Sequence, residues 1–265
     1  MKSVLDQTLE KNKQKYIDRL LKLVSIDTHD IGHGIEGGLE AEGQEYLAEI
    51  FRDIGAEEIV RDPLKEESII KCKELYREGN LGHDYTNRYN LYGTFPGESK
   101  KTLLFNGHID HMPAENEEHW TIPPLKPQVI ENRITGLGVA DMKAGLMASV
   151  MSLELLKDAG ISLPITVKVA SVCDEEGGGN GSLCAAMSGV KADAVVVCEP
   201  TNRELIAAHM GWVFFQIEVE GLAVHSGLKL SGVNAIEKAG KLSERTVAKL
   251  NKAMEKDTGE MLIVL

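Results

Sequence analysis

The feature of this 265-residue sequence that most constrains its fold is the alternation of apolar strand-like segments with helical patterns between residues 102 and 198. Residues 102–105, 165–172 and 194–198 are short apolar runs, and residues 142–159 carry apolar side chains at helical spacing. Apolar strands that alternate with helices are typical of a largely buried sheet covered by helices on both faces. The sequence therefore predicts an α/β fold.

The segments before residue 102 extend this pattern. Amphipathic helices are expected near residues 16–24 and 42–54, and they are followed by a polar, insertion-like segment at about residues 62–88. Residues 90–95 and 102–105 have strand-like composition and flank a Pro-Gly turn, which predicts a hairpin of two adjacent strands.

The organisation changes again after Glu199. Residues 213–219 alternate as in a half-buried strand, and a long helix is expected to begin near Asn234, whose side chain is suited to cap it. We therefore expect a domain boundary near residue 210, with one domain at residues 1–210 and a second at residues 211–265.

Composition excludes several classes of function. Asp and Glu outnumber Lys and Arg by 41 to 29, and a net charge of −12 would repel a phosphate backbone, so no nucleic-acid partner is expected. No apolar stretch reaches about 18 residues and residues 1–20 resemble no signal segment, so we expect neither membrane insertion nor export. Four widely spaced cysteines without a C-x-x-C pair suit reduced thiols in the cytoplasm.

Three of the expected strands end in residue types that bind metals. His108 and Asp110 follow the first, three consecutive acids at residues 174–176 follow the second, and Glu199 follows the third. Because ligands of open α/β sheets gather beyond the carboxyl ends of the strands, we expect these side chains to lie close together. The sequence contains neither a P-loop lysine motif nor a G-x-S-x-G elbow, so nucleotide binding and a serine nucleophile are not supported.

Each of these residues also has an ordinary explanation when it is taken alone. His108 and Asp110 could form a hydrogen-bonded loop, Asp141 could cap the helix that follows it, and Glu199 could be a solvated strand end. The three acids at residues 174–176 are harder to explain, because adjacent carboxylates repel unless a positive charge lies between them. A metal ion would supply that charge, and a neighbouring carboxylate could accept a proton from water.

Five stretches carry a resemblance to a known family. They are NGHIDHMP at 106–113, GLGVADMKAGL at 136–146, VCDEEGGGNGS at 172–182, CEPT at 198–201 and GLAVHSGLKLSGVNAI at 221–236. In this order they resemble the motifs of the M20 metallopeptidases, most closely the acetylornithine deacetylase and succinyl-diaminopimelate desuccinylase branch. The resemblance implies a zinc-exopeptidase-like catalytic domain with a mixed sheet at residues 1–210 and a partial α+β lid or dimerisation domain at residues 211–265.

The resemblance also implies a pair of divalent metal ions. His108 and Glu199 would bind the first ion, Glu176 the second, and Asp141 would bridge both, with a cis peptide bond between Asp141 and Met142. Mixed imidazole and carboxylate ligands fit Zn(II), and Co(II) or Mn(II) could occupy the same positions.

Three further residues take catalytic roles by the same resemblance. Glu175 would be the general base that accepts a proton from water and later delivers it to the leaving amine. Asp110 would orient His108. His225, in the lid, would reach across a homodimer and stabilise the reaction intermediate in the partner's site; alternatively it is a surface histidine after a strand.

Three functions remain open at this point. The first is deacylation of an N-acyl amino acid or a peptide-like substrate, and the second is a dipeptidase or aminopeptidase activity of the same family. In the third, the chain is an inactive fragment that only binds metal or dimerises, because the family takes its last metal-binding histidine from a segment beyond these 265 residues. The apolar tail at residues 261–265 would then be an exposed strand edge.

Overall fold

The computed structural model describes residues 2–207 and 217–254, in two compact units at residues 1–203 and 204–265. The division falls between Arg203 and Glu204, a few residues before the boundary expected from the sequence, and residues 208–216 lie outside the described residues. None of the described helices is long and apolar enough to cross a membrane.

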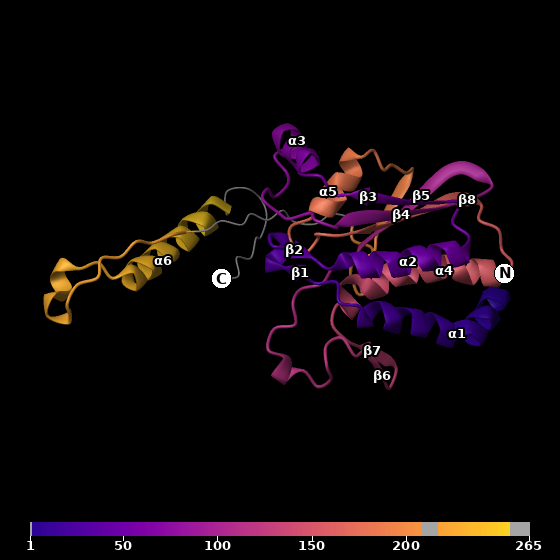
Figure 1. Ribbon diagram of the computed structural model, residues 1–265, viewed down its shortest axis with the longest axis horizontal. Helices are drawn as coiled ribbons and strands as arrows, with labels where there is room; N and C mark the ends of the chain where they lie inside the picture. The colour runs from indigo at the N-terminus through magenta and orange to yellow at the C-terminus, as the bar shows by residue number, and fades with distance from the viewer. Residues whose placement is uncertain (1, 208–216, 255–265) are drawn as a thin grey trace. The chain divides into compact units, whose positions relative to one another are not determined.

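The first unit contains a mixed five-stranded sheet (Figure 1). Strand β4 is antiparallel to both β3 and β8, whereas β5 is parallel to both β8 and β9. The strands in their order across the sheet are β3 (Glu58–Pro63), β4 (Tyr89–Phe95), β8 (Ile165–Val172), β5 (Ser99–His108) and β9 (Ala194–Val197). The α/β class expected from the sequence is confirmed.

The predicted hairpin between β4 and β5 is wrong, because β8 lies between these two strands. In the observed register, Leu91 of β4 pairs with Ser171 of β8, and Phe105 of β5 pairs with Val169 of β8. Strand β8 carries apolar side chains on both faces, which suits a central strand. The Pro-Gly turn connects two strands that neighbour a third rather than each other.

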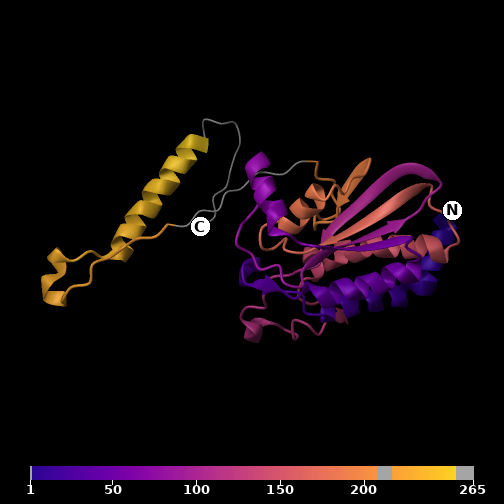
Figure 2. The same cartoon turned by 45° about the horizontal axis from the view of Figure 1, so that its top comes forward.

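Helices cover both faces of this sheet, as predicted. In both views, α1 (Lys2–Ser25), α2 (Glu40–Ile54) and α4 (Ala144–Asp158) form a layer on one face (Figures 1 and 2). The opposite face is covered by α5 (Asn180–Met187), and α3 (Glu66–Tyr76) packs against α5.

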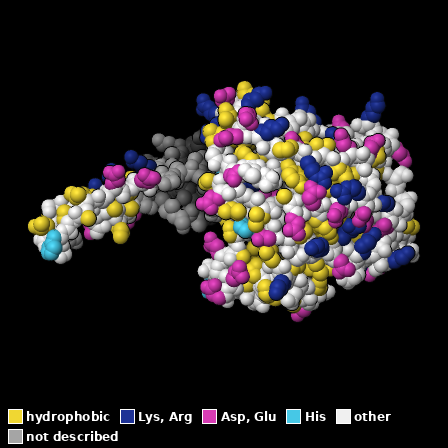
Figure 3. Space-filling view, in the orientation of Figure 1, with side chains coloured by type: hydrophobic (Ala, Val, Ile, Leu, Met, Phe, Trp, Pro, Cys, Tyr) yellow, Lys and Arg dark blue, Asp and Glu magenta, His cyan; other side chains and the backbone are white. Residues whose placement is uncertain are grey.

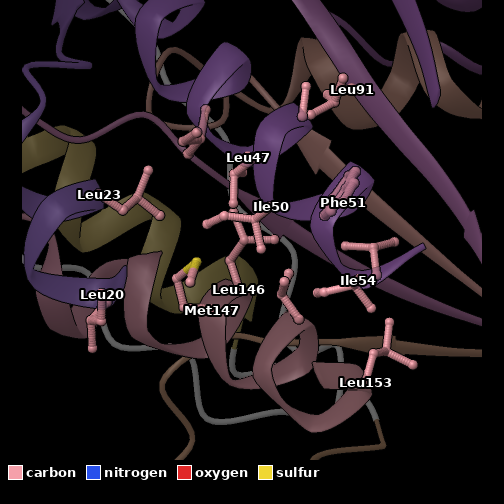
Figure 4. Close-up of a cluster of buried hydrophobic side chains, with 14 of the residues drawn as sticks. Leu20, Leu23, Leu47, Ile50, Phe51, Ile54, Leu91, Leu146, Met147 and Leu153 are labelled. Carbon is pink, nitrogen blue, oxygen red and sulfur yellow. The ribbon is translucent and has the colours of Figure 1, made fainter. Parts of the chain in front are cut away.

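The main hydrophobic core lies between the sheet and the layer of α1, α2 and α4 (Figure 4). Helix α2 contributes Leu47, Ile50, Phe51 and Ile54, which share one face because they are spaced by three or four residues. Burial of each such side chain contributes about 1.5–3 kcal/mol. The helix ends at Gly55, where φ is 98° and the left-handed conformation favours glycine.

Short elements connect the main ones. Two-stranded ribbons form between β1 (Asp30–Ile31) and β2 (Gly37–Gly38), and between β6 (Gln128–Ile130) and β7 (Arg133–Thr135). Short 3-10 turns lie at Gly32–Gly34 and Glu117–His119. The polar segment interpreted as an insertion forms part of β3, helix α3 and a return to β4 that buries His83 and Arg88.

The described part of the second unit contains a 3-10 segment (Ser226–Ser231), an antiparallel bridge between Leu222 and Val233, and α6 (Ala235–Met254). Asn234 caps α6 as predicted, since its Oδ1 accepts the backbone N–H groups of Ile236 at 3.0 Å and Glu237 at 3.3 Å. Most of the predicted strand at residues 213–219 and all of the apolar tail at residues 261–265 lie outside the described residues.

Acidic and basic side chains are interspersed over the first unit on the face shown in Figure 3. One example of such a surface pair is Arg61 with Glu45, whose side chains are 39% and 49% exposed.

Candidate metal centre

The parallel strands carry the candidate side chains to one edge of the sheet. His108 is the last residue of β5, Glu175 and Glu176 follow β8, and Glu199 follows β9. Because β5 runs parallel to both β8 and β9, the carboxyl ends of all three strands lie at the same edge. The topology therefore brings together residues that are up to 91 positions apart in the chain.

His108 is the centre of this group. Its Nε2 lies 3.0 Å from Asp141 Oδ1, 3.8 Å from Glu175 Oε2 and 4.0 Å from Glu199 Oε1. The imidazole is buried, whereas the three carboxylates are partly open to solvent. Potential ligand atoms of His108, Asp141 and Glu199 all lie within 4.8 Å of one another, so the three could hold a single metal ion.

Asp110 connects His108 to the acidic turn. The Nδ1–H of His108 donates to the backbone carbonyl of Asp110 at 3.0 Å, and Asp110 Oδ1 lies 3.6 Å from the same nitrogen. Asp110 Oδ2 accepts the backbone N–H groups of Glu175 and Glu176, each at 2.9 Å. With Nδ1 occupied in this way, Nε2 is the nitrogen available to a metal ion.

Asp141 lies in an irregular turn, Val139–Lys143, that leads into α4. The Asp141–Met142 peptide bond is cis, as the family resemblance implied. The N-cap position of α4 falls on Lys143, so the alternative in which Asp141 caps this helix is wrong. Gly138 has a φ of 67°, and a Cβ at this position would lie 2.9 Å from the Cβ of His111, which explains the need for glycine.

The pKa values of the side chains around His108 indicate that the acidic groups there have too little positive charge beside them. Burial raises the pKa of Glu176 and of Glu199 to about 7, with a further contribution from the Asp141 carboxylate. Burial also raises the pKa of Glu175. Burial alone would lower the pKa of His108, but its contacts with Asp110 and Asp141 outweigh burial and raise it to about 11.

These properties fit a divalent cation. Carboxylates that ionise reluctantly gain stability from a nearby positive charge, and a metal ion is the strongest local source of one. A metal at Nε2 requires the neutral imidazole, so metal binding would displace the proton of His108. One imidazole nitrogen and several carboxylate oxygens are ordinary ligands for Zn(II), Co(II) and Mn(II).

Asp174 differs from its two acidic neighbours, and here the sequence-based interpretation was wrong. The sequence suggested a metal ion as the positive charge among these acids, but Asp174 is fully buried and has other partners. Its Oδ1 lies 3.2 Å from Arg88 Nη1 and its Oδ2 lies 2.9 Å from His83 Nδ1. Arg88 therefore supplies the positive charge beside Asp174. No sequence pattern marked Arg88, because it lies in the polar segment before β4.

Two further histidines from the matched motifs, His225 and His111, lie outside this group. His225 is an exposed residue of the second unit, and its Nδ1 accepts the N–H of Gly227 at 3.1 Å. Its expected role in catalysis stays a prediction. His111 is buried, donates from Nδ1 to the carbonyl of Met112 at 2.8 Å and accepts the N–H of Thr28 at 3.3 Å. His111 thus has a packing role.

Comparison with known proteins identifies the family. The model of "Peptidase family M20/M25/M40" matches residues 104–261, which include every candidate residue from His108 to His225. The chain belongs to this family. The resemblance found in the five sequence stretches is thereby confirmed, and membership places the chain among hydrolases by family.

Two curated relatives and one solved structure illustrate the similarity. The chain is 32% identical over 143 residues to a probable succinyl-diaminopimelate desuccinylase of Staphylococcus aureus, covering 53% of this chain and 35% of the relative. It is 33% identical over 153 residues to an acetylornithine deacetylase of Buchnera aphidicola, covering 57% of this chain and 39% of the relative. A dipeptidase of Saccharomyces cerevisiae shares the fold with a TM-score of 0.59 at 20% identity, over 74% of this chain and 40% of the dipeptidase.

Proposed function

We propose that this M20 protein hydrolyses an amide bond with the help of divalent metal ions and removes the acyl group from an N-acyl amino acid. The observation that carries the proposal is the cluster of His108, Asp141 and Glu199 at the carboxyl edge of the sheet, with Glu175 3.8 Å from His108 Nε2. This arrangement places a candidate base beside a candidate metal-binding site.

The proposed metal ligands follow from the family motifs, and the grouping of His108, Asp141 and Glu199 supports three of them. His108 and Glu199 would hold a first ion, Asp141 would be shared with a second ion, and Glu176 would bind the second. The ions would be Zn(II), with Co(II) or Mn(II) as substitutes. When bound, such ions polarise a carbonyl group and lower the pKa of water.

Glu175 is the proposed general base. Its backbone N–H donates to Asp110 Oδ2 at 2.9 Å. Its side chain is 39% exposed, and its Oε2 lies 3.8 Å from His108 Nε2. Because burial raises the pKa of Glu175, its carboxylate accepts a proton more readily than an ordinary glutamate. In this proposal Glu175 takes a proton from the attacking water and delivers it to the leaving amine nitrogen.

Deacylation is preferred over peptide cleavage because of the degree of sequence similarity. The two curated relatives named above are a desuccinylase and a deacetylase at 32% and 33% identity, whereas the dipeptidase is 20% identical and supports the fold alone. Cleavage of dipeptides is the second candidate. The third candidate is metal binding without turnover, since the described residues gather one group of three potential ligands, enough for one ion, whereas the proposed activity uses two.

The test combines metal content with a panel of substrates. Elemental analysis gives the metal content per chain, and hydrolysis of N-acetylornithine, N-succinyl-diaminopimelate and dipeptides is measured in added zinc or cobalt. Turnover of an acylated amino acid supports the proposal, turnover of dipeptides alone supports the second candidate, and metal binding without turnover supports the third. The matched variant Glu175→Gln should keep its metal and lose turnover by about 10²–10⁴-fold.

The proposed homodimer, in which His225 reaches the partner's site, has a separate test. Chains carrying Glu175→Gln and chains carrying His225→Asn should each be inactive, and mixing them should restore part of the activity because some sites then combine two intact residues. Activity that does not rise on mixing would place His225 outside the partner's site.

A further inference from the structure

Arg88 is a fully buried cation surrounded by three acids, of which Asp30 and Glu40 precede it and Asp174 lies much later in the chain. Its Nε donates to both carboxylate oxygens of Glu40 at 3.1 Å, and its Nη2 donates to Asp30 and Glu40. Its Nη1 donates to the backbone carbonyl of Gly34 and to Asp174 Oδ1, each at 3.2 Å. We call Arg88, Asp30, Glu40 and Asp174 the Arg88 cluster. One planar guanidinium thus joins β1, the start of α2 and the end of β8.

Asp174 connects this cluster to the candidate metal centre. It is a non-glycine residue with a φ of 60°, a left-handed conformation that is unfavourable for most side chains. Its side chain is held by Arg88 and by His83, and its backbone N–H donates to Glu40 Oε1 at 3.3 Å. These contacts fix a conformation in which the Asp174 side chain is buried, while Glu175 and Glu176 are partly exposed.

The next two residues are held from the opposite side. The backbone N–H groups of Glu175 and Glu176 donate to Asp110 Oδ2, and Asp110 in turn contacts His108. The acidic turn therefore has two buried anchors, Asp110, which follows β5, and the Arg88 cluster. Loss of the Arg88 anchor would leave the Asp174 carboxylate buried without its guanidinium partner, which favours a rearrangement of the turn.

We infer that Arg88 is a positioning residue, which holds Glu175 and Glu176 toward His108 by fixing the backbone of Asp174. The inference rests on the proposed function for its catalytic consequence, but its structural content is independent of turnover. Arg88 touches none of the carboxylates of the metal centre in the described structure, so it acts through Asp174. A lysine would keep the charge but could not reproduce the planar fork that reaches Asp30, Glu40 and Asp174 together.

The decisive experiment compares Arg88→Lys with a matched control, Arg19→Lys, in the full chain. Arg19 also forms ion pairs, with Glu154 at 2.9 Å and Asp53 at 3.2 Å, but it joins α1 to α4 and α2, away from the acidic turn. Its side chain is 18% exposed. Both variants therefore keep a positive charge while disturbing a guanidinium-carboxylate contact.

The first readout is amide hydrogen exchange in metal-free protein. In Arg88→Lys, exchange at the N–H groups of Glu175 and Glu176 should accelerate about tenfold more than exchange at the N–H of Val169 in the central strand β8, because the turn opens locally. Arg19→Lys should show no such selective change. Exchange at Glu175 and Glu176 that follows Val169 in parallel, or stays at the wild-type rate, would overturn the inference and leave Arg88 with a purely structural role.

The second readout is turnover with metal added. If the protein deacylates its substrate, Arg88→Lys should lower kcat by about 10–100-fold with KM unchanged, as expected for loss of a residue that orients another. A wild-type chain without turnover would count against the proposed function, while the exchange experiment would still decide the role of Arg88.

Glu40→Gln is the second variant, in case Arg88→Lys does not fold. Its amide oxygen can still accept the N–H of Asp174, but the charge that pairs with Arg88 is lost. The same selective acceleration at Glu175 and Glu176 is expected with a smaller size, and uniform exchange would again overturn the inference.

Discussion

Two groups of acidic side chains lie on opposite sides of the turn at residues 174–176, and they differ in the source of their neutralising charge. In the Arg88 cluster the side chains are at most 1% exposed, and the protein itself supplies the cation. Around His108 the side chains of Asp141, Glu175 and Glu199 are 37–59% exposed. Consecutive residues of one turn thus belong to two environments.

This difference separates structural acids from acids available to a ligand. A buried carboxylate must be paired or neutralised, because water cannot solvate it. Arg88 pairs with Glu40, Asp174 and Asp30, and burial, together with nearby Asp110, raises the pKa of Asp30 to about 10. The outer acids are partly open to solvent, and the raised pKa values of Glu175, Glu176 and Glu199 mean that a bound cation would favour their charged forms.

The largest expected effect comes from a matched pair of substitutions in adjacent environments. Asp174→Asn should lower the free energy of unfolding by about 3–5 kcal/mol, because it leaves a buried guanidinium short of a partner. Glu176→Gln should change it by less than about 1 kcal/mol in metal-free protein, because this carboxylate is half-buried and forms no comparable ion pair with the described residues. Urea unfolding measures both, and equal losses would contradict the distinction between the two groups.

Asp110 joins His108 to the acidic turn on the side of the metal centre. Asp110→Asn should weaken zinc affinity by about 10–100-fold, because an amide orients His108 less firmly than a carboxylate does. Isothermal titration with zinc measures the change. A distant surface substitution, Asp193→Asn, is the control and should leave zinc affinity at its wild-type value. Unchanged affinity in Asp110→Asn would show that the His108 ring is held without this carboxylate.

His111 is a buried side chain whose acidic contacts are weaker than those of Arg88, so it tests the effect of burial on a pKa. Burial, followed by the nearby Lys143, lowers the pKa of His111 to about 4 from its ordinary value of 6.5. The unfolded chain therefore binds a proton that the folded chain refuses between these values, and stability falls as pH falls through this window. From pH 7 to pH 5 the loss should be about 2 kcal/mol. Urea unfolding of wild type and His111→Gln at both pH values isolates this contribution, and identical pH dependence would refute it.

The smallest effect is expected at the surface pair of Arg61 and Glu45, which has the same chemistry as the pair of Arg88 and Glu40 but is solvated. The hydrogen bond from Arg61 lowers the pKa of Glu45 to about 2, so the stabilisation is present above the ordinary value of 4.5 and is lost as pH falls toward 2. Solvent screening limits it to at most about 1 kcal/mol. Glu45→Gln should therefore shift urea unfolding slightly at pH 7 and not at pH 2. If Glu45→Gln lowered the free energy of unfolding nearly as much as Asp174→Asn does, burial would not explain the difference between the two ion pairs.

Much of the fold and the outline of the candidate site were predictable from local pattern. Apolar runs and helical spacing gave the strands at residues 165–172 and 194–198 and the helix before residue 159, because periodicity reports which faces are buried. The positions of His108 and Glu199 at strand ends predicted their proximity, because parallel strands present their carboxyl ends at one edge. Asn234 was recognisable as a cap from its residue type and position.

The sequence by itself therefore determined the elements, the family motifs and the edge of the sheet where the ligand-type residues gather. Only the tertiary structure decided that β8 separates β4 from β5, since periodicity does not specify which strand is a neighbour. It also decided that Asp174 turns inward to Arg88, a partner 86 residues away in the chain. The physical reason is that burial of a charge requires an opposite charge in space, and the chain topology, rather than any local pattern, determines which residue supplies it.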